Sequence, residues 1–232
     1  MPASDDALAL RRFVLAHTAV VAPPLLPELP LHLATEMTPL WHATEKDFAA
    51  HGIEPPFWAF AWAGGQGLAR FLLDEPSVVR GRRVVDFAAG SGLVALAAAR
   101  AGAAAVISID RDPLAVAAMQ LNAERLGLRI DARLGDVLDG VGASGSLLAG
   151  LDEAEVVTAG DVCYDAAWAP RALGWLRAQA GRGALVLLGD PGRLYAPRAG
   201  LVEVARYRIE SIDDVDAEPT STGVVFRLDA VA

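Results

Sequence analysis

Hydrophobic and polar positions change their pattern along the chain, and the first pattern covers the N-terminal part. Apolar side chains recur at helical spacing over residues 5–17, and Ser4 or Asp5 is available as the N-cap. Four prolines within residues 23–30 predict an extended connector, because proline fixes φ and removes a backbone donor. The aromatic residues that follow are Trp41, Phe48, Phe57, Trp58 and Trp62. We therefore expect residues 1–55 to form an N-terminal helical and aromatic extension, or lid.

Beyond this region, short apolar runs alternate with helical segments, which is typical of a parallel sheet with helices on both faces. The predicted strands are residues 83–87, 105–110, 130–134, 156–161, 184–188, 202–209 and 223–228. The predicted helices are residues 93–101, 113–126 and 166–180. No helix separates the last two strands, so we expect them to pair antiparallel. The pattern predicts an α/β fold, with one domain over residues 56–232 built on a mostly parallel seven-strand sheet.

Charge and composition narrow the classes of function. The chain has 20 Lys and Arg against 29 Asp and Glu, a formal net charge of -9. Nucleic-acid binders draw much of their affinity from cationic side chains, so this balance argues against a nucleic-acid partner. Cys163 is the single cysteine, which excludes an intramolecular disulfide and a cysteine-rich zinc site, and the four histidines lack ligand spacing. We expect no metal site.

The sequence also indicates in which cellular compartment to expect the protein. No apolar run is long enough to span a membrane, and the acidic start does not resemble a signal or transit peptide. The lone cysteine fits a reducing compartment. We expect a cytoplasmic protein with no membrane partner.

Acidic residues stand at the carboxyl ends of the predicted strands, where open parallel sheets bind ligands. They are Asp86, Asp110, Asp136, Asp161 and Asp190. A single aspartate in such a place is usually a helix N-cap or turn former. Five in corresponding positions favour a ligand site.

A glycine-rich loop, residues 86–92, follows the first strand of the sheet. Its sequence formally matches the dinucleotide pattern G-x-G-x-x-G/A from Gly90 to Ala95, and Asp110 lies 20 residues beyond Gly90. However, the Asp86 carboxylate stands where a pyrophosphate needs neutral space, and no Tyr-x-x-x-Lys or paired Cys/His chemistry follows. A ligand with a cationic head suits this loop better than a nicotinamide cofactor.

On these residues the chain resembles the class I, or seven-strand, methyltransferases, which use S-adenosylmethionine and release S-adenosylhomocysteine. The resemblance implies a Rossmann-like sheet. It also implies that Asp86 and the Gly90/Gly92 loop hold the methionyl end, Asp110 both ribose hydroxyls and Asp136 the adenine amino group. Ala88 stands where many relatives have the first glycine of the loop. The cofactor-binding residues expected from the resemblance are Trp62, Gly65, Asp86, Ala88, Gly90, Gly92, Asp110, Asp136 and Val137.

Further stretches resemble the seven-strand lysine methyltransferases, which carry an Asp-x-x-Tyr motif, here residues 161–164. Within that group the chain is most similar to the family of electron transfer flavoprotein beta subunit lysine methyltransferases. The similar stretches are residues 56–66, 72–74, 160–165 and 189–193.

This narrower resemblance implies a protein-lysine N-methyltransferase of the bacterial cytoplasm whose protein partner is the electron transfer flavoprotein beta subunit. It implies that Asp161 and Tyr164 are catalytic, because an acceptor must orient the N–H bonds of the lysine amine. It also implies that Trp58, Asp190 and Arg193 bind the substrate.

Two other functions stay open. The same cofactor domain could methylate a small amine, a nicotinamide-like nitrogen heterocycle or another protein, since one fold serves many substrates. A non-catalytic cofactor-binding or assembly protein is the third reading, and the Asp161/Tyr164 pair speaks against it.

Two features have a structural interpretation as well. Trp58 and Trp62 are spaced as neighbours on one helix face, where core packing competes with ligand contact. The acidic run within residues 210–218 is expected to be a solvated loop that attracts a lysine-bearing surface.

Overall fold

The computed structural model describes residues 3–38, 55–138, 149–197, 199–209 and 221–230. The aromatic residues Trp41 and Phe48 and the acidic run of residues 210–218 lie outside these ranges.

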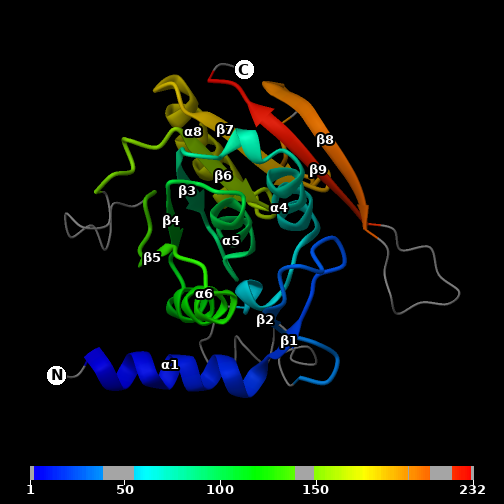
Figure 1. Ribbon diagram of the computed structural model, residues 1–232. Coiled ribbons are helices and arrows are strands. Elements are labelled where there is room, and N and C mark those ends of the chain that lie inside the picture. Colours follow the sequence, from blue (N-terminus) through cyan, green and yellow to red (C-terminus); the bar gives the residue numbers. More distant parts are fainter. Residues whose placement is uncertain (1–2, 39–54, 139–148, 198, 210–220, 231–232) are drawn as a thin grey trace, which may run out of the picture.

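A seven-strand sheet forms the centre of the molecule, in the order β5-β4-β3-β6-β7-β9-β8 (Figure 1). Its strands are β3 (Arg83–Phe87), β4 (Ala105–Asp110), β5 (Asp131–Leu134), β6 (Val156–Gly160), β7 (Leu185–Asp190), β8 (Leu201–Ile209) and β9 (Ser221–Leu228). Strands β3 to β7 run parallel, while β9 pairs antiparallel with both β7 and β8. The predicted sheet is confirmed, with β6 at its centre.

Helices cover both faces of this sheet (Figure 1). The helices are α4 (Ala63–Asp74), α5 (Leu93–Arg100), α6 (Pro113–Leu126) and α8 (Trp168–Gly181). Successive residues of a strand point to opposite faces, so Val84 belongs to the core beneath α4 and α5, and Val85 to the core beneath α8. The alternation of apolar side chains therefore builds two cores.

The ends of α6 explain why its predicted bounds agree with the structure. At its start, the Asp112 carboxylate accepts the Leu114 N–H at 2.8 Å, and Pro113 occupies the first turn. At its end, Gly127 adopts the left-handed conformation with φ 63°. The cap at Asp112 and the glycine at position 127 each act within a few residues, so both can be recognised in the sequence.

The N-terminal residues pack against the sheet domain. Helix α1 (Ala3–His17) lies along α6, to which the ion pair of Arg11 with Glu124 ties it at 2.6 Å. Because α1 begins at Ala3, the prediction of Ser4 or Asp5 as its N-cap is wrong.

The prediction of an extended connector over residues 23–30 is wrong, because this segment turns twice: the Leu26 N–H donates to the Pro23 carbonyl at 2.8 Å and the Leu29 N–H to the Leu26 carbonyl at 3.0 Å. Strands β1 (Ala19–Val21) and β2 (Leu31–Leu33) form a short antiparallel ladder. Leu26 and Leu29 between them are fully buried in the core beneath α4 and α5. The boundary at residues 55 and 56 stays a prediction.

Short 3-10 helices, η1 (Phe57–Ala59) and η2 (Pro76–Val78), flank α4. Among the helices that the structure describes, none is both long and apolar enough to cross a membrane.

Candidate functional site

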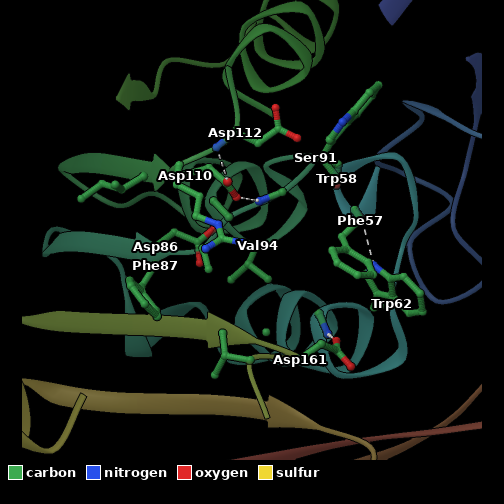
Figure 2. A pocket seen from close by; sticks show the side chains of 18 of the residues that line it. Phe57, Trp58, Trp62, Asp86, Phe87, Ser91, Val94, Asp110, Asp112 and Asp161 are labelled. Carbon is green, nitrogen blue, oxygen red and sulfur yellow. Dashed lines mark hydrogen bonds between the residues drawn. The ribbon is translucent and has the colours of Figure 1, made fainter. Parts of the chain in front are cut away.

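A pocket opens at the carboxyl ends of strands β3 to β6 (Figure 2). Its wall combines the loops that follow these strands with the segment between η1 and α4. The predicted site residues that line it are Trp58, Trp62, Gly65, Asp86, Ala88, Gly90, Asp110, Asp136, Val137, Asp161, Tyr164 and Arg193. The lining does not include Gly92 or Asp190.

The loop after β3 turns through left-handed conformations. Gly90 has φ 54° and Gly92 has φ 81°, the region that favours glycine. A Cβ at Gly92 would lie 2.9 Å from the Met119 side chain, so this glycine allows α5 to start against α6. Ala88 adopts φ 53° in the same loop, although it has a Cβ.

The Asp110 carboxylate joins the loops after β3 and β4. Its Oδ2 accepts the Gly90 N–H at 2.9 Å and its Oδ1 accepts the Asp112 N–H at 3.0 Å (Figure 2). Burial raises the pKa of Asp110 to about 6, against the lowering effect of these two bonds.

Asp86 lies deeper in the pocket wall. Thr158 donates its hydroxyl to Oδ1 at 2.7 Å, and the Ala95 N–H of α5 donates to Oδ2 at 3.1 Å. Burial raises the pKa of Asp86 to about 7, and the Asp110 charge adds to the rise. A buried carboxylate beside a partly buried one suits a ligand that brings hydroxyl and cationic groups.

Asp161 faces these carboxylates from the other side of the pocket, next to Trp62 (Figure 2). Its Oδ2 accepts the backbone N–H of Gly65 at 2.7 Å, in the first turn of α4. Its Oδ1 accepts hydrogen bonds from Arg193, at 2.9 Å from Nη2 and 3.2 Å from Nε. Asp161 itself adopts φ 58°, a left-handed conformation that aspartate tolerates better than most residues. Burial raises its pKa, and the Arg193 charge opposes that rise.

Glycines let α4 approach the strand ends closely enough for this contact. A Cβ at Gly64 would collide with the Gly189 carbonyl of β7 and lie 2.7 Å from the Asp161 carboxylate. A Cβ at Gly160 would lie 3.0 Å from the Gly65 Cα. The close approach places the positive end of the helix dipole at the Asp161 carboxylate.

The Asp190 carboxylate fixes the backbone turn that leads to Arg193. This fully buried carboxylate accepts the N–H groups of Gly192 and Arg193, both at 2.7 Å, through its Oδ1. It therefore forms the turn that aims the Arg193 side chain at Asp161. Cys163 is buried nearby, and burial with the Asp190 charge raises the pKa of its thiol to about 12.

Aromatic rings form the outer part of the pocket. The Trp62 indole N–H donates to the Phe57 carbonyl at 2.9 Å, and the ring of Phe57 lies 5.3 Å from that of Tyr164. The Arg193 guanidinium lies over the Trp62 ring at 5.5 Å. These three rings are about two-fifths exposed, which leaves them open to a ligand.

The prediction that Trp58 and Trp62 share one helix face is wrong. Trp58 belongs to η1, while Trp62 is the N-cap of α4, and extended backbone at Phe60 separates the two elements. Trp58 is 2% exposed and packs among residues of α1 and α6, such as Val14 and Met119.

Sequence reasoning missed an aromatic and cationic group on the opposite wall. Phe87 and Trp168 stack with their ring centroids 6.0 Å apart, and the Arg111 guanidinium lies 5.2 Å over the Trp168 ring. All three residues line the pocket. Arg111 directly follows Asp110 in the sequence, so its place at the end of β4 could have been predicted. Trp168 reaches the pocket only through the packing of α8, which the sequence does not indicate.

Comparisons with known proteins place this geometry in context. The family model for ribosomal protein L11 methyltransferase (PrmA) matches residues 70–141. The electron transfer flavoprotein beta subunit lysine methyltransferase of Xenopus laevis is 37% identical over 194 residues, 83% of this chain and 74% of the relative. The enzyme of the same name from Danio rerio is 33% identical, covering 93% of this chain and 82% of the relative.

A relative from Caenorhabditis elegans, named as a homolog of the same enzyme, is 32% identical and covers 94% and 91% of the two chains. Among solved structures, a putative RNA methyltransferase from Pyrococcus horikoshii aligns with a TM-score of 0.50 at 20% identity. That alignment covers 69% of this chain and 82% of the other. The structural match supports the fold alone.

Proposed function

We propose, because this chain belongs to the family of electron transfer flavoprotein beta subunit lysine methyltransferases, that it methylates lysines of such a beta subunit with S-adenosylmethionine as donor. Membership makes the chain a protein-lysine methyltransferase. The observation that carries the proposed substrate is the 37% identity over 83% of the chain.

The pocket fits the proposed methyl donor by the chemistry of its lining. Asp86 and Gly90 would hold the methionyl end, while Gly92, which faces Met119 rather than the pocket, would act by letting the loop pack against α6. The Asp110 carboxylate would accept from the ribose hydroxyls. Asp136 and Val137 would hold the adenine. Trp62, Gly65 and Ala88 would complete these contacts. When bound, S-adenosylmethionine supplies a methyl group on a positively charged sulfur.

The acceptor amine would enter past the aromatic rings toward Asp161. Asp161 and Tyr164 would orient its N–H bonds, because they line the pocket beside the exposed Trp62 ring. Arg193 would form the wall on the substrate side. A substrate contact of Trp58 stays a prediction, since this residue is 2% exposed and packs against α1 and α6. Asp190 would act through Arg193, since it does not line the pocket.

The test is the intact mass of purified electron transfer flavoprotein beta subunit after incubation with enzyme and S-adenosylmethionine. We expect added increments of about 14 daltons, one for each methyl group, and none without enzyme. Labelled donor added to a cell extract separates the alternatives: a small labelled metabolite would favour a small amine as substrate. No transfer to any acceptor would favour a non-catalytic binding protein.

The remaining partner and location assignments stay predictions. The cytoplasmic location rests on the single cysteine and the absence of a signal-like start, the assignment to a bacterium on the resemblance alone, and the exclusion of nucleic acid on the net charge.

A further inference from the structure

Both oxygens of the Asp161 carboxylate are already engaged in the structure. Gly65 of α4 donates to Oδ2, and the Arg193 guanidinium donates to Oδ1 through two nitrogens. The Asp161 side chain is 7% exposed and the Arg193 side chain 26% exposed, so the pair lies mostly out of water. Its charges therefore interact strongly with each other and with any amine brought beside them.

Four elements place dipolar, charged or titratable groups around the pair of Asp161 and Arg193. Helix α4 contributes only the backbone N–H groups of its first turn. The loop after β6 contributes the neutral Cys163 thiol and the Tyr164 phenol, and β3 contributes Asp86 on the far side of the pocket. The end of β7 contributes Asp190. Among the described residues of this wall, Arg193 is the cation that pairs with Asp161, and the Asp190 carboxylate lies outside the pocket lining.

The net charge of the Asp161–Arg193 pair affects whether an acceptor lysine binds as the ammonium or as the free amine. The amine must be neutral to attack a methyl group, because an ammonium has no lone pair. A buried carboxylate without a counter-ion would favour the ammonium and raise the pKa of the lysine. A carboxylate paired with a guanidinium still accepts a hydrogen bond but exerts little net attraction on an ammonium.

We propose that Arg193 is a positioning residue that neutralises Asp161, so that the substrate lysine binds as the free amine. The inference rests on the proposed function. Asp190 supports it by fixing the turn before the guanidinium, and Trp62 by stacking against its face.

The atoms and charges of the reaction balance. The lysine ammonium releases one proton to water as it binds. The nitrogen lone pair then forms the new N–C bond while the S–C bond breaks and its electrons stay on the sulfur. The positive charge moves from sulfur to nitrogen, and no further reactant is needed.

The test compares wild type with Arg193→Gln, Arg193→Lys and Arg206→Gln. The last removes the same charge from β8, at a residue outside the pocket lining. The acceptors are the purified flavoprotein beta subunit and, in parallel, the proteins of a cell extract. For Arg193→Gln we expect the rising limb of the pH profile of kcat to move up by about one pH unit. Turnover should then fall by up to about tenfold at pH values below the wild-type limb and recover at alkaline pH. In Arg193→Lys and Arg206→Gln the rising limb of the kcat profile should stay at its wild-type pH.

Proton release on binding gives a readout that does not need turnover. Calorimetry with the beta subunit and S-adenosylhomocysteine, in two buffers of different ionisation enthalpy, counts the protons. At a pH midway between the rising limbs of the two proteins, wild type and Arg193→Lys should release more than half a proton per bound lysine, and Arg193→Gln less than half. If Arg193→Gln is slower by the same factor at every pH and releases as many protons as wild type, the inference is overturned. If wild type methylates neither acceptor, the proposed function fails and the inference fails with it.

Discussion

The backbone N–H of Gly65 donates to the carboxylate of Asp161 at 2.7 Å across 96 positions of sequence. This bond joins the first turn of α4 to the end of the central strand β6. It forms because glycines on both elements remove the side chains that would hold them apart. The carboxylate proposed to orient the substrate is therefore also an anchor for a helix.

Substituting Gly64 with alanine should disturb this anchor. The new Cβ would meet the Gly189 backbone, which cannot move as a flexible side chain can. We expect a loss of about 1–3 kcal/mol in unfolding free energy, together with reduced turnover. Denaturant unfolding measures the first effect. Gly174→Ala in α8, where the Cβ meets open space, is the control and should stabilise by about 0.5–1 kcal/mol. Equal stability of both variants would contradict the packing argument.

Replacing Ala88 with glycine should stabilise the protein. Ala88 adopts φ 53°, a conformation that costs a residue with a Cβ about 1–2 kcal/mol. Part of this gain is offset by the greater freedom of glycine in the unfolded chain, so we expect a net gain of about 1 kcal/mol or less. Ala178→Gly inside α8 should instead destabilise by about 1 kcal/mol. A stability loss at position 88 would show that the Ala88 side chain makes a contact worth more than the strain.

The ligand-free protein should lose stability as pH rises, partly because of Asp86. The folded pKa of Asp86 is about 7 against an ordinary value of 3.8, so the folded protein binds the extra proton. The stabilisation is complete below pH 3.8 and is lost as pH rises through about 7. Asp86→Asn cannot titrate. Its amide oxygen can still accept the Ala95 N–H, while its NH2 group would donate to the Thr158 hydroxyl, which donates to Asp86 in the wild type. The unfolding free energy of Asp86→Asn relative to wild type, measured by denaturant unfolding, should therefore increase from pH 5 to about pH 7, by at most about 1.4 kcal/mol per pH unit, and stay level above pH 7. A constant difference between the two proteins over this range would contradict the raised pKa.

Substituting Asp110 with alanine should weaken binding of S-adenosylmethionine. The change removes a charge-assisted contact to the ribose hydroxyls, which contributes about 1.5–3 kcal/mol. Calorimetry on the purified variant measures the affinity. Because Asp110 also binds two backbone N–H groups, thermal unfolding must be checked alongside. Unchanged affinity in a folded variant would remove Asp110 from the proposed cofactor site.

Asp161→Asn and Tyr164→Phe should lower turnover much more than cofactor affinity. Both side chains face the part of the pocket proposed for the acceptor amine, so their interactions act on the reaction rather than on donor binding. Turnover with saturating flavoprotein beta subunit and the calorimetric affinity for S-adenosylhomocysteine separate the two effects. Wild-type turnover in Asp161→Asn would exclude the orienting role.

Much of the fold follows from the sequence alone, because the relevant signals are local. Strand β3 ends at Phe87, just before the glycine-rich loop, and α6 begins at Pro113 and ends before Gly127, where short-range caps act. The acidic residues at strand ends were also predictable, since parallel strands bring their carboxyl ends to one edge of the sheet. Four of the five line the pocket.

The tertiary structure decided what those residues do. Only the packing of α4 against β6 and β7 turns Asp161 into a helix anchor, and only the turn held by Asp190 brings Arg193 to it. Trp58 and Trp62 have helical spacing, yet they lie in separate elements, because Trp58 is buried against α1 and α6. Local sequence determines the conformation of each segment. Contacts between side chains far apart in the chain depend on how all the segments pack together, and no short window of sequence encodes that.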